Sequence, residues 1–83
     1  MQNRNYHELT QDDAIVAFAA DWQPGDQVRI RRHIGSTLRC TIDQIDVEGG
    51  FVYVIANEAR ISHDAGDRVM LWPRQIDRIV VDS

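Results

Sequence analysis

Hydrophobic and polar residues alternate along the middle of the chain in the pattern of β-strands. In residues 27–31, Val28 and Ile30 point to one side and the polar residues between them to the other. The polar positions are Gln27, Arg29 and Arg31. This strand is therefore predicted to have one face toward a core and one toward water.

The next segment, residues 37–47, alternates as well, but its phase shifts near Asp43-Gln44. Leu38, Cys40 and Ile42 precede the shift, and Ile45 and Val47 follow it out of phase. An extra residue in one strand turns later side chains to the other face, so the shift predicts a β-bulge. Glu48-Gly49-Gly50 then predicts a hairpin loop, since glycine readily adopts the positive φ angles of tight turns.

Two further segments, residues 51–56 and 69–72, are apolar on both faces. One face of each strand in a small sheet should meet water, so these segments predict a cover over the outer wall. The N-terminal helix, a second subunit or both can supply it. The connection between them, residues 57–66, is polar; residues 73–76 predict a 3₁₀ turn and residues 77–81 a closing strand.

The first part of the chain carries a helical pattern. Thr10 is a predicted N-cap, and Asp12 and Asp13 follow it, where negative charge favours the helix dipole. Apolar residues recur at helical spacing at Ile15, Phe18, Ala19 and Trp22. We expect a helix through about residue 20, ended by Pro24-Gly25, with its apolar stripe covering an open end or an exposed wall of the sheet.

Together these elements predict a mainly β fold, an SH3-like five-stranded barrel with one short N-terminal α-helix. The 83 residues suit a single domain. Residues 1–23 form its N-terminal segment and helix, and residues 24–83 form the barrel.

The charge distribution limits the possible partners. The chain has thirteen acidic residues against nine arginines and no lysine, a net charge of −4. This balance argues against a nonspecific nucleic-acid binder, although residues 27–39 hold four arginines and no acid. The absence of lysine excludes a Schiff-base lysine from these 83 residues.

The composition also bears on location. No apolar run approaches the ~20 residues that span a membrane, and residues 1–10 show no signal-peptide pattern. Cys40 is the only cysteine, so an internal disulfide is impossible and a buried thiol is expected. We expect a cytoplasmic protein with no membrane contact.

The sequence contains no recognisable catalytic, metal or cofactor motif. His63-Asp64 is an adjacent histidine–carboxylate pair, but acid–base catalysis also needs a nucleophile or a metal, and a solvated loop pair is the alternative. His7 and His33 lack metal-ligand spacing with His63. We therefore assign no catalytic residue, no metal ligand and no cofactor.

Arginines and aromatic residues are the candidate binding groups. Arg29, Arg31 and Arg39 should lie on the outer faces of neighbouring strands with Thr41 beside them, as a patch for phosphate, carboxylate or a neighbour's acids, or as a solvated surface. Tyr53 and Trp72 can stack on bases if they lie next to these arginines. Packing in a core or a subunit interface is the alternative for both.

Three segments carry a family resemblance: Gly25-Asp26-Gln27-Val28-Arg29, Val69-Met70-Leu71-Trp72-Pro73 and Ile76-Asp77-Arg78-Ile79. Over residues 24–80 the chain resembles the SH3-like barrels of plasmid-encoded type II dihydrofolate reductases. Those enzymes are homotetramers whose active site is a central pore. The resemblance implies that residues 69–72 would line such a pore, with Met70 in place of a glutamine, Trp72 in place of a tyrosine and Ile30 in place of a lysine. It therefore implies the fold and the assembly, and it speaks against reductase activity.

The opening turn and strand are equally similar to KOW domains, Tudor-like domains and small barrel subunits of electron-transfer enzymes. We therefore expect a non-enzymatic SH3-like interaction module that forms a homo-oligomer and binds a protein partner. The alternatives are a nucleic-acid-binding small barrel and a pore-type ligand-binding or reductase-like oligomer. The candidate contact residues are Arg29, Arg31, Arg39, Tyr53, Met70 and Trp72. The compact chain is compatible with an origin in a mobile element.

Overall fold

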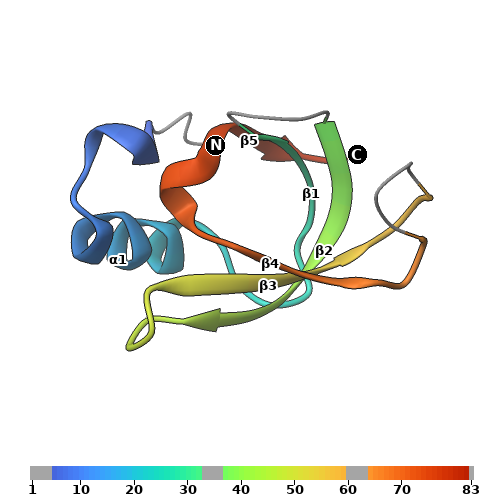
Figure 1. Cartoon of the computed structure of the whole chain (residues 1–83), viewed down its shortest axis with the longest axis horizontal. Helices are drawn as coiled ribbons and strands as arrows, with labels where there is room; N and C mark the ends of the chain where they lie inside the picture. Colours follow the sequence, from blue (N-terminus) through green and yellow to red (C-terminus); the bar gives the residue numbers. More distant parts are fainter. Residues whose placement is uncertain (1–4, 33–36, 60–63, 83) are drawn as a thin grey trace.

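The computed structural model describes residues 5–32, 37–59 and 64–82, which form one antiparallel sheet, one α-helix and two 3₁₀ turns (Figure 1). The strands are β1 (Gln27–Arg32), β2 (Thr37–Asp46), β3 (Phe51–Ala56), β4 (Arg68–Leu71) and β5 (Ile76–Val81). The helix is α1 (Gln11–Asp21), and the turns are η1 (Tyr6–Glu8) and η2 (Pro73–Gln75). The mainly β fold with one N-terminal helix is confirmed.

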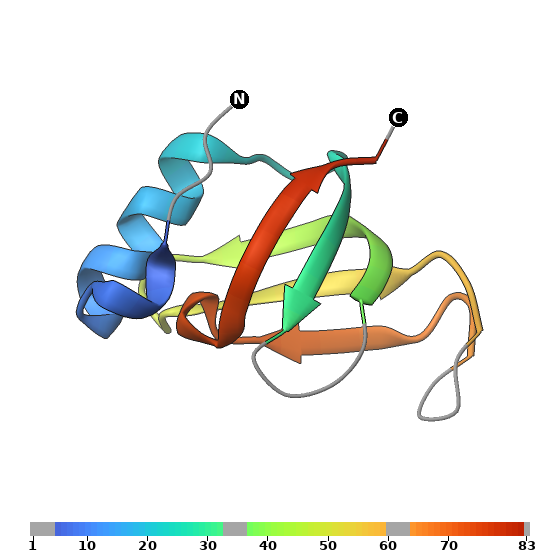
Figure 2. The same ribbon diagram turned by 90° about the horizontal axis from the view of Figure 1, so that it is seen from above.

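The sheet has the strand order β4-β3-β2-β1-β5, and every pairing is antiparallel. Within the described residues the hydrogen-bonded ladder ends at β4 and β5 and is not closed. The sheet is strongly curled, so that β1 and β5 cross over β3 and β4 (Figures 1 and 2). The inner faces of the two halves enclose the core.

The core follows the alternation of the sequence. Its sheet residues are almost fully buried: Val28, Ile30, Leu38, Cys40, Ile42, Val52, Val54, Ala56, Leu71, Ile76 and Ile79. The predicted bulge is confirmed, because the pairing of β2 with β3 changes register between Ile42 and Gln44. Beyond the bulge, Ile45 packs partly against the core. The expectation for Val47 is wrong: it is 47% exposed, because β2 ends at Asp46 and Val47 lies in the hairpin turn.

Helix α1 has the predicted N-terminus. The side chain of Thr10 accepts a hydrogen bond from the backbone N–H of Asp13, at 3.2 Å. Ile15, Phe18 and Trp22 are buried as expected, but Ala19 is exposed and Ala14 is buried instead. The buried face of the helix runs through Ala14, Ile15 and Phe18, and Trp22 enters the core from extended backbone after the helix ends at Asp21.

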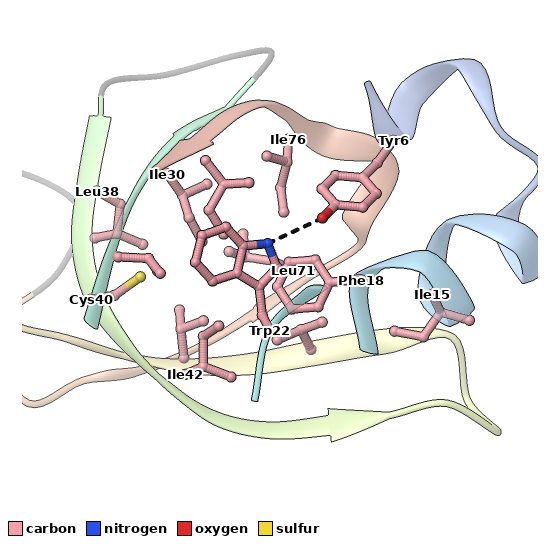
Figure 3. Close-up of a cluster of buried hydrophobic side chains, with 14 of the residues drawn as sticks. Tyr6, Ile15, Phe18, Trp22, Ile30, Leu38, Cys40, Ile42, Leu71 and Ile76 are labelled. Atoms are coloured by element: carbon pink, nitrogen blue, oxygen red, sulfur yellow. Dashed lines mark hydrogen bonds between the residues drawn. The ribbon is translucent and has the colours of Figure 1, made fainter. Parts of the chain in front are cut away.

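Helix α1 lies at one end of the curled sheet, where its buried side chains join the core (Figures 1 and 3). Among the described residues it packs against η1, η2 and β2. It therefore covers an open end of the sheet, one of the two placements expected. The partly exposed outer side chains of β3, namely Phe51, Tyr53 and Ile55, are not part of the cluster that α1 joins.

Tyr6 is a core residue that the sequence pattern did not indicate. Its ring is fully buried, with its centroid 5.5 Å from that of Phe18. Its hydroxyl donates to Asp21 Oδ2 at 2.8 Å and accepts from Trp22 Nε1 at 3.1 Å (Figure 3). Tyr6 thereby joins η1 to the last residue of α1 and to the residue that follows it.

The C-terminal elements largely agree with the sequence. The 3₁₀ turn at residues 73–75 is confirmed, and β4 begins and ends one residue earlier than expected, which places Trp72 between β4 and η2. Two of the histidines considered in the sequence, His33 and His63, lie outside the described residues. None of the described helices is both long and apolar enough to cross a membrane.

Candidate functional site

An exposed aromatic surface lies on the outer side of β3 and β4. We call it the aromatic face, and it consists of Phe51, Tyr53, Met70 and Trp72. Phe51 and Tyr53 alternate with the buried Val52 and Val54 along β3, and Tyr53 is paired in register with Met70 of β4. Met70 is 44% exposed and the three aromatic residues are half-buried, so the structure brings the three predicted contact residues of this region together.

The three rings of the aromatic face pack edge to face. The ring centroid of Phe51 lies 5.3 Å from that of Tyr53 and 5.6 Å from that of Trp72, with interplanar angles of 84° and 78°. Such contacts add stability beyond the area they bury and fix the rings in one arrangement. Phe51 was missed as a member because its sequence position gives no sign of its contact with Trp72.

Gly49 makes room for the central ring of this cluster. A Cβ atom on Gly49 would lie 2.4 Å from Cε2 of Phe51 and 2.9 Å from Oδ2 of Asp46. Any side chain there would displace the Phe51 ring or the carboxylate. Gly49 therefore supports the aromatic face because its lack of a side chain lets the Phe51 ring lie close to the hairpin backbone.

Arg68 forms a charged rim on the aromatic face. Its guanidinium carbon lies 3.7 Å from the centre of the Tyr53 ring, in cation–π geometry. Its Nε donates to Asp43 Oδ2 at 3.0 Å, and its Nη2 donates to Gln44 Oε1 at 3.0 Å. The bulge in β2 thus places an acid and an amide where they hold the guanidinium group of Arg68 over the Tyr53 ring.

The other side of Trp72 opens into a small hollow of about 180 Å³, lined by Gln11, Trp72, Pro73, Arg74 and Gln75. The Gln75 side chain accepts a hydrogen bond from the Trp72 backbone N–H at 3.0 Å. This bond and Pro73 hold the short turn that presents the indole. The aromatic face and the hollow are therefore continuous through Trp72.

The arginines lie on a second surface, formed by β1, β2 and β5. Arg29, Arg31 and Arg39 lie on the outer face as the alternation predicted, and Arg29 is directly opposite Arg39. Asp82 bridges that pair: Arg39 donates to it through Nε at 3.0 Å and Nη2 at 3.3 Å, and Arg29 Nε lies 3.6 Å from its Oδ1. The hydrogen bonds and charge of Asp82 raise the pKa of Arg39.

Arg78 is a further member of this surface that the sequence analysis missed. It lies in β5 directly opposite Arg31. A hollow of about 330 Å³ is lined there by Arg29, Arg31, Thr37, Arg78 and Val80. Only the pairing of β5 with β1 reveals this position, and that pairing joins segments far apart in the sequence.

The structure does not bring the aromatic residues next to these arginines. Tyr53 and Trp72 belong to the side of the sheet formed by β3 and β4, where Tyr53 lies opposite Gln44 and carries Arg68. Arg29, Arg31 and Arg78 lie on β1 and β5, at the other side of the strand order. Tyr53 and Trp72 therefore do not form, together with these arginines, a surface on which bases could stack beside bound phosphates.

Cys40 is buried in the core, and desolvation raises its pKa to about 12; nearby Arg32 opposes this shift. A protonated thiol is a poor nucleophile. Asp64, next to His63, donates its backbone N–H to the carboxylate of Asp67 at 2.9 Å in a turn. Within the described ranges, no three histidine, cysteine or acidic residues group closely enough to hold a metal ion.

In comparisons with known proteins, no family model matches this sequence, and no curated protein or solved structure matches it significantly.

Proposed function

We propose that this chain is a non-enzymatic SH3-like interaction module that forms a homo-oligomer through its aromatic face. The SH3-like assignment is supported by the five-strand order β4-β3-β2-β1-β5, the curl of the sheet and the 3₁₀ turn between β4 and β5. The resemblance to the type II reductase barrels belongs to the same proposal. We propose that the chain shares their fold but not their reductase activity.

The observation that carries the proposal is the group of large side chains left partly uncovered on β3 and β4. Aromatic residues, methionine and arginine are enriched at the centres of protein interfaces. Here Phe51, Tyr53 and Trp72 form a rigid cluster, with Met70 exposed beside it and Arg68 laid over one ring. Because rigid rings lose little conformational entropy on association, such a cluster is a favourable binding surface.

A second copy of the chain is the occupant we assign to this surface. The rim of the aromatic face carries both signs of charge, with Arg68 beside Asp43. A rim with both signs is self-complementary, because a twofold rotation places the arginine of one copy near the acid of the other. A strongly acidic or strongly basic partner would meet a like charge on this rim and would therefore fit it less well than a second copy does.

Multi-angle light scattering across micromolar concentrations tests this proposal. The wild-type chain should elute with a mass above that of one chain, and Met70→Glu should dissociate at least about tenfold more readily, because it places a carboxylate in an apolar contact. Val16→Glu is the matched control. Val16 is 57% exposed on α1 and is not one of the four residues of the aromatic face, and the substitution makes the same change of charge.

The control should assemble as the wild type does. A wild-type chain that is monomeric throughout the concentration range would contradict the proposal. Equal dissociation of Met70→Glu and Val16→Glu would do so as well, because it would place the contact elsewhere or attribute the effect to net charge.

A further inference from the structure

Two pairs of like charges face each other across the outer surface of β1. Arg29 is opposite Arg39 of β2, and Arg31 is opposite Arg78 of β5. Like charges directly opposite one another in a sheet are destabilising. Each pair is therefore expected to need a compensating negative charge nearby.

The first pair has its compensating charge within the chain. The backbone N–H of Asp82 donates to the carbonyl of Gln27 at 2.9 Å, which sets the Asp82 carboxylate beside Arg29 and Arg39. The carboxylate contacts both guanidinium groups, at 3.6 Å and 3.0 Å. Its side chain is only 10% exposed, so this is a formed contact between the strands.

The second pair has no such charge within the described part of the chain: no carboxylate there forms an ion pair with Arg31 or Arg78. The two arginines line the hollow of about 330 Å³ together with Arg29, Thr37 and Val80. Thr37 lies opposite Arg31 on the other side, so the row across the sheet runs Arg78, Arg31, Thr37. This row offers two guanidinium groups and one hydroxyl.

We propose that this row is a binding site for the phosphate group of a small molecule, which bridges Arg31 and Arg78 as Asp82 bridges Arg29 and Arg39. Guanidinium groups donate paired hydrogen bonds to phosphate oxygens, and a threonine hydroxyl supplies one more donor. A small ligand is favoured over a nucleic acid for two reasons. The chain has a net charge of −4, and the aromatic residues that would stack on bases lie on the other side of the sheet.

Titration of the full-length chain with sodium pyrophosphate and with inorganic phosphate, at constant ionic strength, tests the site. The Nε–Hε resonances of the arginines report which side chains respond. Saturable shifts of Arg31 and Arg78 are expected, with affinity reduced at least about tenfold in Arg31→Gln and in Arg78→Gln. The matched control is Arg74→Gln, an exposed arginine of η2 with the same loss of charge, which should bind as the wild type does.

A thermal readout separates binding from damage to the fold. Pyrophosphate should raise the melting temperature of the wild type and of Arg74→Gln, and leave that of Arg31→Gln unchanged. Without phosphate, Arg31→Gln should be at least as stable as the wild type, because the repulsion with Arg78 is removed. Phosphate binding should persist in Met70→Glu. The phosphate site is therefore tested independently of the proposed contact through the aromatic face.

Three results would overturn the proposal. One is the absence of saturable binding of either phosphate by the wild type. A second is an equal loss of affinity in Arg74→Gln, which would show a general effect of net charge. The third is binding of a single-stranded oligonucleotide at low salt with none of pyrophosphate, which would assign the surface to a nucleic-acid backbone instead.

Discussion

At the scale of single residues, the environment of Cys40 determines its chemistry. The thiol lies in the core between the two halves of the sheet, and desolvation raises its pKa to about 12. In the unfolded chain the same thiol ionises near its ordinary pKa of about 8.5. The folded state therefore keeps a proton that the unfolded state releases at alkaline pH.

This difference predicts an alkaline loss of stability. The contribution of Cys40 to folding is fully present below pH about 8.5 and decreases as the pH rises toward the folded pKa of about 12. At pH about 10 the wild type should have lost roughly 1–2 kcal/mol more than Cys40→Val, each relative to its own value at neutral pH. Chemical denaturation at several pH values measures this difference in the free energy of unfolding. Parallel pH profiles for the two proteins would contradict the prediction.

At the scale of elements, Tyr6 shows how η1 is attached to the rest of the fold. Its hydroxyl is the acceptor for the indole N–H of Trp22, which is itself buried at the end of α1. An indole N–H without an acceptor in a core costs free energy. The hydroxyl therefore stabilises the contact between the N-terminal turn and the core.

Replacing this hydroxyl should destabilise the chain. Tyr6→Phe is expected to lower the free energy of unfolding by about 1–3 kcal/mol, because the Trp22 N–H loses its acceptor. Tyr53→Phe is the matched control, since within the described residues the Tyr53 hydroxyl makes no hydrogen bond, and its effect should stay within about 0.5 kcal/mol. Denaturant titration followed by tryptophan fluorescence compares the two; an equal effect of both substitutions would rule out this role for Tyr6.

The elements that local pattern determines were predictable from the sequence. The alternation around Val28 and Ile30, the phase shift at the bulge and the Thr10 cap all depend on neighbouring residues, and all three are found. Tyr6 and Val47 were not predictable in the same way. Tyr6 is buried by contacts fifteen and sixteen residues away, and Val47 is exposed because the strand ends just before it.

At the scale of the whole molecule, the curled sheet separates two surfaces of different chemistry. The sequence indicated Tyr53, Met70, Trp72, Arg29, Arg31 and Arg39 as candidate contact residues, but not that the first three and the arginines lie on different surfaces. Asp82 and Arg78 were missed, because β5 reaches β1 across almost fifty residues of sequence and no local pattern specifies that pairing. The contact of Phe51 with Trp72 was missed for the same reason.

We propose that two copies of the chain meet at the aromatic face. An isotope-filtered NOE experiment on a mixture of labelled and unlabelled chains tests it most directly. We expect intermolecular contacts from the Met70 methyl group to the rings of Tyr53 and Trp72. A dimer whose intermolecular contacts all lie on β1 and β5, or a mixture with no intermolecular contacts at all, would contradict it.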